Sequence, residues 1–304
     1  MHYADALRKP FAQALLRLRY SLIRYKKIFL GGPCNNNCLH CPPSYRNSTP
    51  TDFSTIEQAL GQRDSDSIVL FGGEPTLRND LLRIVADARS SGYRRIKIMT
   101  NGRALSNVHY LEQLIRAGCS LFEITLWGSN AGAHESLSRA PGSFWETITG
   151  LRNLAEVPYD KFICIRIPVC RETLGDLEQC VATALNLGAH RIILSMQDAR
   201  LSILAAIPHI SNGINISIFN RVWILTEGIP FCFMQGLEHH ISEVYTGWET
   251  IYQRTYQKGR HCSECICQEI CPGVDVLSAK KLGSGDILPV KAGRVFEDIK
   301  ALYD

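Results

Sequence analysis

The stretch Cys34-Asn35-Asn36-Asn37-Cys38-Leu39-His40-Cys41 decides how the rest of the chain is interpreted. It places three cysteines in one short loop with the spacing CxxxCxxC, after an apolar run over 27–30 and a Gly-Gly-Pro turn. Three thiolates on a tight loop can bind one metal centre together, because the loop orders all three at little further entropic cost. Three protein ligands also leave one iron of a four-iron cubane open to a small molecule.

A zinc loop is the alternative interpretation of these cysteines. Structural zinc sites are usually closed by four protein ligands, commonly from two CxxC-type halves. The next cysteine in the chain is Cys119, far from the loop in sequence. The ligand type and spacing therefore favour an open iron–sulfur site over closed zinc.

A second motif, Gly72-Gly73-Glu74-Pro75, directly follows a buried apolar run over Ser67–Phe71. Alone, it predicts an ordinary turn from a strand to a helix. Two adjacent glycines also let the backbone approach a ligand with no Cβ in the way. With both motifs present, the sequence resembles the radical S-adenosylmethionine (radical SAM) superfamily.

The resemblance implies a 4Fe–4S cluster on Cys34, Cys38 and Cys41, with S-adenosylmethionine (SAM) chelating the open iron through its methionine part. It implies that Gly72, Gly73, Glu74 and Pro75 contact the amino group of SAM through backbone carbonyls and the glutamate. It further implies an enzyme that cleaves SAM reductively to a 5′-deoxyadenosyl radical, which removes a hydrogen atom from a substrate. An external electron donor of the flavodoxin or ferredoxin type would supply the electron.

The chain has 304 residues, 45% hydrophobic and 20% charged, which is enough for a large core. Apolar, β-branched runs alternate with helical stretches, which predicts parallel strands joined by right-handed crossovers. A closed barrel needs eight such units. Six fit a partial (β/α)6 TIM-like barrel, as in the resembled superfamily. The predicted strands are Lys27–Leu30, Ser67–Phe71, Arg95–Met99, Phe122–Leu126, Phe162–Val169 and Arg191–Ser195.

Candidate site residues follow from the carboxyl ends of these strands, where the chemistry of such barrels gathers. By resemblance, Thr125 and Ser129 are candidates for the ribose of SAM, and Arg139 and Arg166 for its carboxylate. Asn101 is a further cofactor-binding candidate at the end of the third strand. Cys170 lies just past the fifth strand, where a thiol could donate a hydrogen atom to a product radical; the alternative is an inert core thiol.

A second group of cysteines lies near the C-terminus, within His261–Gly273. Cys262, Cys265 and Cys271 resemble the SPASM/Twitch domain that carries auxiliary 4Fe–4S clusters. Full SPASM domains have another cysteine four residues on, where this chain has Asp275. The resemblance therefore implies one auxiliary 4Fe–4S cluster on Cys232, Cys262, Cys265 and Cys271, with Cys267 as a spare or alternative ligand. The same four thiolates could instead form a zinc knuckle.

Three segments are predicted: an amphipathic helix over 1–26, the radical SAM barrel over 27–200, and an auxiliary iron–sulfur domain with a tail over 201–304. Apolar residues recur at steps of three and four in the first segment, among many Lys and Arg residues. This helix either recruits an acidic partner or covers the barrel with its charged face in water.

Composition also narrows where the protein acts and which partners it binds. Twelve cysteines without an apolar signal segment indicate a cytoplasmic chain with reduced, partly metal-bound thiols. No run is long enough to span a bilayer. Only the basic N-terminal helix supports nucleic acid as a partner. We therefore expect a peptide or protein substrate, with small-molecule or cofactor biosynthesis as the alternative, and a non-catalytic iron–sulfur carrier as the alternative from a different class.

Overall fold

The computed structural model describes residues 25–42, 44–46, 48–198, 200–243, 256–268, 271, 273–280, 282 and 288–290. Its contacts divide the chain into two compact units, one over Tyr25–Thr226 and a second that includes the residues from Glu227 onward. The helix predicted over 1–26 lies outside the described residues, except for its last two positions, which belong to the first strand.

The first unit is built on one seven-stranded sheet in which the strands follow one another in chain order. The first six strands pair in parallel, as the alternating pattern predicts. The partial (β/α)6 barrel is thus confirmed, and the sheet gains a seventh strand beside the sixth. The strands are β1 (Tyr25–Phe29), β2 (Ser67–Phe71), β3 (Arg95–Thr100), β4 (Leu121–Thr125), β5 (Phe162–Val169), β6 (Arg191–Met196) and β7 (Trp223–Glu227).

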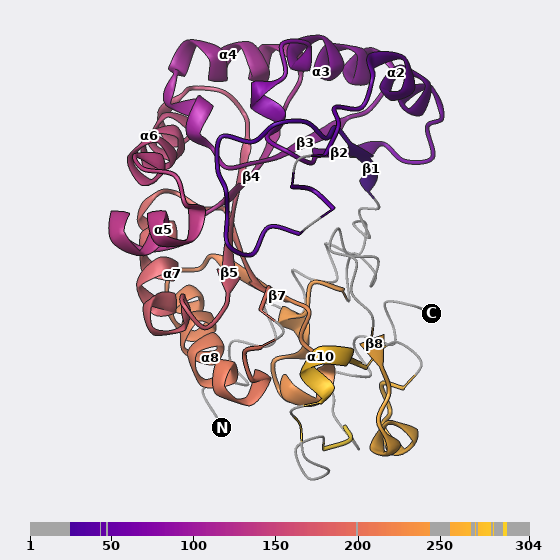
Figure 1. Ribbon diagram of the computed structural model, residues 1–304, viewed down its shortest axis with the longest axis vertical. Helices are drawn as coiled ribbons and strands as arrows, with labels where there is room; N and C mark the ends of the chain where they lie inside the picture. The colour runs from indigo at the N-terminus through magenta and orange to yellow at the C-terminus, as the bar shows by residue number, and fades with distance from the viewer. Residues whose placement is uncertain are drawn as a thin grey trace. The chain divides into compact units, whose positions relative to one another are not determined.

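Helices join the strands and form an outer arc around the sheet (Figure 1). They are α2 (Phe53–Gly61), α3 (Leu81–Ser90), α4 (Val108–Ala117), α5 (Ala131–Ser138), α6 (Ser143–Glu156), α7 (Leu177–Asn186) and α8 (Ile203–Phe219). The sequence pattern did not single out α2 or α5. Because α8 packs on α7 and leads into β7, the compact unit continues to Thr226, past the predicted boundary at 200.

Strand β3 shows how the sequence orients its side chains. Its residues alternate between half-buried and buried, so that Ile96, Ile98 and Thr100 lie in the core. The opposite face carries Lys97, whose ammonium lies 2.9 Å from Glu123 of β4. Glu123 is 2% exposed and also accepts a hydrogen bond from the guanidinium of Arg166 at 2.6 Å. The barrel therefore contains a buried group of three charges on three adjacent strands.

The second unit has little regular structure among its described residues. Two short strands, β8 (Tyr256–Gln257) and β9 (Val274–Asp275), pair antiparallel and precede the helix α10 (Val276–Ala279). Gly273 has φ +99°, and a Cβ there would lie 2.1 Å from the carbonyl oxygen of Gln257. Only glycine therefore allows this close turn. In the described parts of both units, no helix combines the length and apolar character that crossing a bilayer requires.

Candidate iron–sulfur and SAM site

The first cysteine loop, Cys34–Cys41, follows β1 and is tied to the end of α5 by its backbone. The N–H of Asn37 donates to the carbonyl of Ser138 at 2.9 Å, and the N–H of Leu39 donates to that of Leu137 at 2.8 Å. These bonds resemble strand pairing, and they fix the loop from outside. The loop is therefore held by its neighbours as well as by its own turn, in which the N–H of Cys41 donates to the carbonyl of Cys38 at 3.2 Å.

Two arginines hold the carbonyls and amides of the same loop. Arg103 donates to the backbone carbonyl of Asn35 and, at 2.9 Å, to the side-chain oxygen of Asn36. Arg46 donates to the carbonyl of Cys38 at 2.7 Å. These contacts satisfy polar groups that a bare loop would leave to water, so the loop is ordered before any ligand binds.

The three thiols of this loop influence one another's ionisation. Burial raises the pKa of Cys34 to about 11, and the nearby Cys41 thiolate adds to the effect. Burial raises the pKa of Cys38 to about 12, and the charges of Cys34 and Cys41 raise it further. Negative charges on three thiolates of one loop repel one another in a desolvated site. A cationic metal centre is what stabilises them together, so the donor set suits an iron–sulfur cluster with three protein ligands.

The Gly72-Gly73-Glu74-Pro75 turn lies directly against this loop. Gly73 has φ +57°, and a Cβ there would come within 2.6 Å of the carbonyl oxygen of Gly32. The N–H of Glu74 donates to the carbonyl of Pro33 at 3.0 Å. The predicted proximity of the two motifs is thus present, because two glycine-rich backbones meet without side chains between them.

The carboxylate of Glu74 is buried and hydrogen-bonded to other groups of the protein. It accepts hydrogen bonds from the N–H and hydroxyl of Thr76 and from the hydroxyl of Thr100, the last at 2.6 Å. It also accepts the backbone N–H of Asn101 at 2.8 Å. Glu74 therefore fixes the end of β3 as well as its own turn, while its contact with the amino group of SAM stays a prediction.

The other residues predicted to contact SAM have different surroundings. Thr125 ends β4 and lies in register with Arg166, whose guanidinium pairs with Glu123. The hydroxyl and N–H of Ser129 both donate to the carboxylate of Asp176, at 2.5 and 2.7 Å. The side chain of Arg139 is exposed, at the left-handed C-cap of α5. The structure thus gives Arg166 an internal partner, and the SAM contacts of these residues stay predictions.

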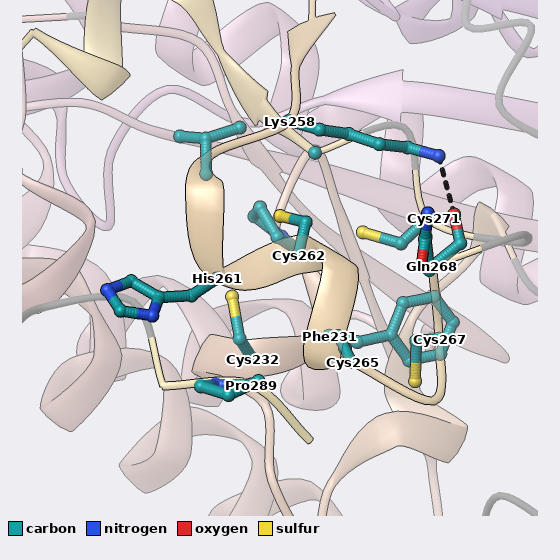
Figure 2. A pocket seen from close by; sticks show the side chains of 13 residues that line it. Phe231, Cys232, Lys258, His261, Cys262, Cys265, Cys267, Gln268, Cys271 and Pro289 are labelled. Atoms are coloured by element: carbon teal, nitrogen blue, oxygen red, sulfur yellow. Dashed lines mark hydrogen bonds between the residues drawn. The ribbon is translucent and has the colours of Figure 1, made fainter. Parts of the chain in front are cut away.

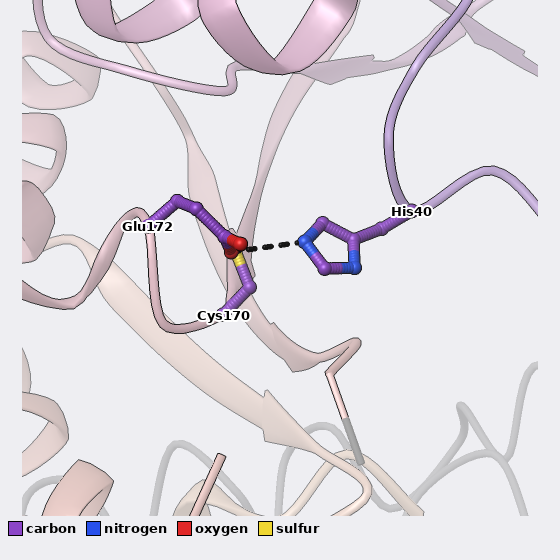
Figure 3. Close-up of side chains that lie close together, drawn as sticks. All are labelled: His40, Cys170 and Glu172. Atoms are coloured by element: carbon purple, nitrogen blue, oxygen red, sulfur yellow. Dashed lines mark hydrogen bonds and ion pairs between the residues drawn. The ribbon is translucent and has the colours of Figure 1, made fainter. Parts of the chain in front are cut away.

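A cluster that the sequence did not reveal contains His40, Cys170 and Glu172. Their ligand atoms all lie within 4.8 Å of one another, and His40 Nε2 lies 3.0 Å from Glu172 (Figure 3). His40 also stacks on Trp127 with ring centroids 6.2 Å apart. No local pattern links positions this far apart in sequence. Cys170 is fully buried, and burial raises the pKa of its thiol to about 11, so its role as a hydrogen donor stays a prediction.

The second cysteine group lines a pocket in the second unit. Figure 2 shows Cys232, Cys262, Cys265 and Cys271 around this pocket, together with the Lys258 ammonium that donates to the carbonyl of Gln268 at 2.6 Å. Burial raises the pKa of Cys232 to about 12, and the charges of Cys271, Cys262 and Cys265 add to the effect. Four thiols from two distant segments therefore converge, which suits one closed metal centre of either predicted kind.

Cys267 differs from those four. It is 1% exposed, and its sulfur points away from the sulfurs of Cys232 and Cys262 (Figure 2). Its thiol has charge neighbours in Cys265 and Cys271, but neither Cys232 nor Cys262 is among them. Whether Cys267 is a spare cysteine or an alternative ligand stays a prediction. All twelve cysteines of the chain lie in described residues, and all are free thiols.

The fold and the first loop define a class of protein: a parallel α/β barrel with three thiols at the carboxyl end of its first strand. The model of the radical SAM superfamily matches residues 28–184, which is more than half of the chain. The chain therefore belongs to the radical SAM superfamily. Membership implies a 4Fe–4S cluster and SAM, and Cys34, Cys38 and Cys41 are the residues that would hold the cluster.

Curated relatives match about half of the chain. The AdoMet-dependent heme synthase of Methanosarcina barkeri is 29% identical over 164 residues, which is 51% of this chain and 45% of that protein. The probable GTP 3′,8-cyclase of Saccharolobus islandicus is 27% identical over 175 residues, 55% of each chain. This chain thus spans about half the length of these relatives.

Solved structures share the fold over most of the chain. SuiB of Streptococcus suis bound to S-adenosylmethionine has a TM-score of 0.62 and 13% identity, and the match covers 91% of this chain and 79% of that one. The structure of anSMEcpe with AdoMet and the Cp18Cys peptide has a TM-score of 0.59 and 11% identity, and it covers 91% of this chain and 96% of that one. At these identities the likeness concerns the fold alone.

Proposed function

We propose that this protein is a radical SAM enzyme that acts on a peptide or protein and uses a second, auxiliary 4Fe–4S cluster. The observation that carries the proposal is that Cys34, Cys38 and Cys41 lie on one loop whose start meets the Gly73-Glu74 turn backbone to backbone. When bound, the cluster and SAM supply a one-electron reductive cleavage that yields a 5′-deoxyadenosyl radical for hydrogen abstraction.

The chain's own residues order and shield this chemistry. Ser138 and Leu137 hold the loop backbone, and Arg103 and Arg46 hold its carbonyls. Three free thiols supply the cluster ligands, and Gly73 lets the glycine-rich turn pack directly against the backbone of Gly32, just before the cysteine loop. Trp127, 6% exposed, covers the loop on the side of Cys38 and limits access of water there.

The peptide substrate is favoured by the fold neighbours that extend beyond the barrel. SuiB has been solved with the precursor peptide SuiA, and anSMEcpe with a peptide, and each match covers more than nine-tenths of this chain. Small-molecule or cofactor biosynthesis is the second candidate, since the heme synthase and the GTP cyclase share sequence with part of this chain. Those matches cover only about half of this chain, whereas the peptide-bound neighbours also cover the second unit.

The first experiment tests for catalysis. Anaerobically reconstituted protein is incubated with SAM and dithionite, and 5′-deoxyadenosine is measured by mass spectrometry. We expect SAM cleavage by the wild type and none by Cys34→Ala, while Cys119→Ala, which removes a buried thiol away from the loop, remains active. A wild type that holds its first cluster yet forms no 5′-deoxyadenosine supports the non-catalytic carrier instead.

The second experiment counts metals and names the substrate class. Two clusters predict about eight irons per chain, whereas a zinc knuckle at Cys232 predicts about four irons and one zinc. The genes beside this one then supply the probes. A short peptide encoded there should stimulate 5′-deoxyadenosine formation and change in mass. Stimulation by a small metabolite, with the peptide unchanged, would favour the second candidate.

A further inference from the structure

A chain of hydrogen bonds runs from the glycine-rich turn to a sulfur of the first cysteine loop. Its first link is the buried carboxylate of Glu74, which accepts the hydroxyl of Thr100 at 2.6 Å and the N–H of Asn101 at 2.8 Å. The carbonyl of Asn101 accepts the hydroxyl of Thr147 from α6 at 2.9 Å. Hydrogen bonds therefore fix both the N–H and the carbonyl of Asn101, and the bond to the Glu74 carboxylate is charge-assisted.

The side-chain amide of Asn101 has one orientation that satisfies its neighbours. Its oxygen accepts the N–H of Arg103 at 3.0 Å, so its nitrogen faces the cysteine loop. This nitrogen donates to the side-chain oxygen of Asn35 at 2.6 Å and lies 4.0 Å from the sulfur of Cys34. An amide nitrogen has two hydrogens, so one serves Asn35 and the other is available to the sulfur.

Cys34 thus has two N–H donors of different kinds. The backbone N–H of Asn36 approaches the same sulfur at 3.4 Å, but it belongs to the loop itself and cannot be removed by substitution. The Asn101 donor directly follows strand β3, 67 positions from Cys34 in the sequence, and a single substitution can remove it. Hydrogen bonds to cluster sulfurs stabilise added negative charge and so raise the reduction potential of a cluster.

We propose that Asn101 is a positioning residue whose amide N–H, held in place by Glu74 and Arg103, raises the reduction potential of the cluster bound at Cys34. The inference rests on the proposed function only in requiring a cluster there. One electron enters the cluster from the external donor, no bond forms or breaks, and the amide keeps its proton. The glycine-rich turn thereby influences the electron transfer as well as the binding of SAM.

The test is a redox titration of the holoenzyme without SAM, followed by electron paramagnetic resonance. The signal of the first cluster is identified by its absence in Cys34→Ala. Asn101→Asp replaces the donor by a negative charge, and Asn101→Ala removes the donor alone. At a fixed donor potential, we expect the ratio of reduced to oxidised cluster to fall about tenfold in Asn101→Asp, which is ~59 mV for one electron, and less in Asn101→Ala.

The matched control is Asn107→Asp, the same substitution at an exposed helix N-cap. Asn107 accepts the N–H of Tyr110 at 3.2 Å, and aspartate caps a helix equally well, so its cluster should titrate as in the wild type. Wild-type potentials in both Asn101 variants overturn the inference. Loss of iron from both also overturns it, because Asn101 would then build the loop rather than tune the cluster.

The outcome is distinguishable from that of the proposed function. If the wild type forms no 5′-deoxyadenosine but the Asn101 variants shift the potential, the inference stands and the proposed catalysis fails. If SAM is cleaved and the potentials do not shift, only the role of Asn101 is lost. An unchanged potential together with a SAM affinity that falls in Asn101→Ala assigns Asn101 to cofactor binding alone, as the sequence predicted.

Discussion

Replacing Glu123 by glutamine tests the buried charges inside the barrel. Glu123 is 2% exposed and lies between Lys97 at 2.9 Å and Arg166 at 2.6 Å. Burial alone would raise the pKa of this carboxyl, but the attraction of Arg166 and Lys97 prevails and lowers it to about 2. Glutamine keeps the shape of the side chain and removes the charge, so two buried cations lose a shared anion.

The loss can be sized in two ways. Lowering a carboxyl pKa from its ordinary 4.5 to about 2 corresponds to about 3 kcal/mol of stability at neutral pH. Removing one partner of a buried ion pair costs ~3–5 kcal/mol in general. The two routes agree at about 3 kcal/mol, which for a unit of this size lowers the melting temperature by about 6–12 °C.

The assay is anaerobic thermal unfolding of the wild type and Glu123→Gln, followed by tryptophan fluorescence. The control is Glu112→Gln, because Glu112 makes an exposed pair with Arg116 at 3.3 Å and should contribute less than ~0.5 kcal/mol. Since the folded pKa of Glu123 is depressed, its contribution is complete above the unfolded value near 4.5 and is lost as pH falls toward 2. A Glu123→Gln melt no lower than that of Glu112→Gln at pH 7 would refute the reasoning.

Three further predictions concern other parts of the molecule. Gly73→Ala should abolish cluster binding, because its Cβ would lie 2.6 Å from a carbonyl oxygen, whereas Gly61→Ala, with open space around it, should keep full iron content. Burial raises the pKa of Glu243 to about 7, so the folded protein holds a proton there that the unfolded chain has lost. The melting temperature of the second unit should therefore fall as the pH rises from 5 to 7, and Glu243→Gln should remove this dependence. Cys170, fully buried with a thiol pKa of about 11, should resist iodoacetamide at pH 8 in folded protein and react after unfolding.

The sequence predicted the barrel well because local patterns encode it. Six apolar runs correspond to β1–β6 with boundaries shifted by at most two residues. The seventh strand was not predicted. Its segment lies in an apolar and β-branched stretch over 214–226 that also contains the end of α8, so periodicity did not separate a helix from a strand there. A short helix such as α5, with eight residues, also gives a weak periodic signal.

The site was predictable where its residues share a motif and less so where they meet through folding. The cysteine spacing and the glycine-rich turn are local, and the structure places them together. The partners of Arg166 and Ser129 are not local. Arg166 was a candidate for the carboxylate of SAM, but its partner in the structure is Glu123, 43 positions away, and this pairing depends on strand register. Asp176 beside Ser129 depends on the packing of loops in the same way.

The two cysteine groups differ in what organises them. The loop at Cys34 is held by backbone bonds to Leu137 and Ser138 and by two arginines, so its order comes from the barrel. Among the described residues of the second unit, the only strand pairing joins two strands of two residues each, and four thiols converge where little regular structure surrounds them. A metal centre there would contribute folding energy directly, whereas a cluster at Cys34 would bind to a loop already in place. That difference suits the proposed division of roles: a preordered loop can leave one iron open to a ligand, and a closed four-thiol centre can stabilise the unit that holds it.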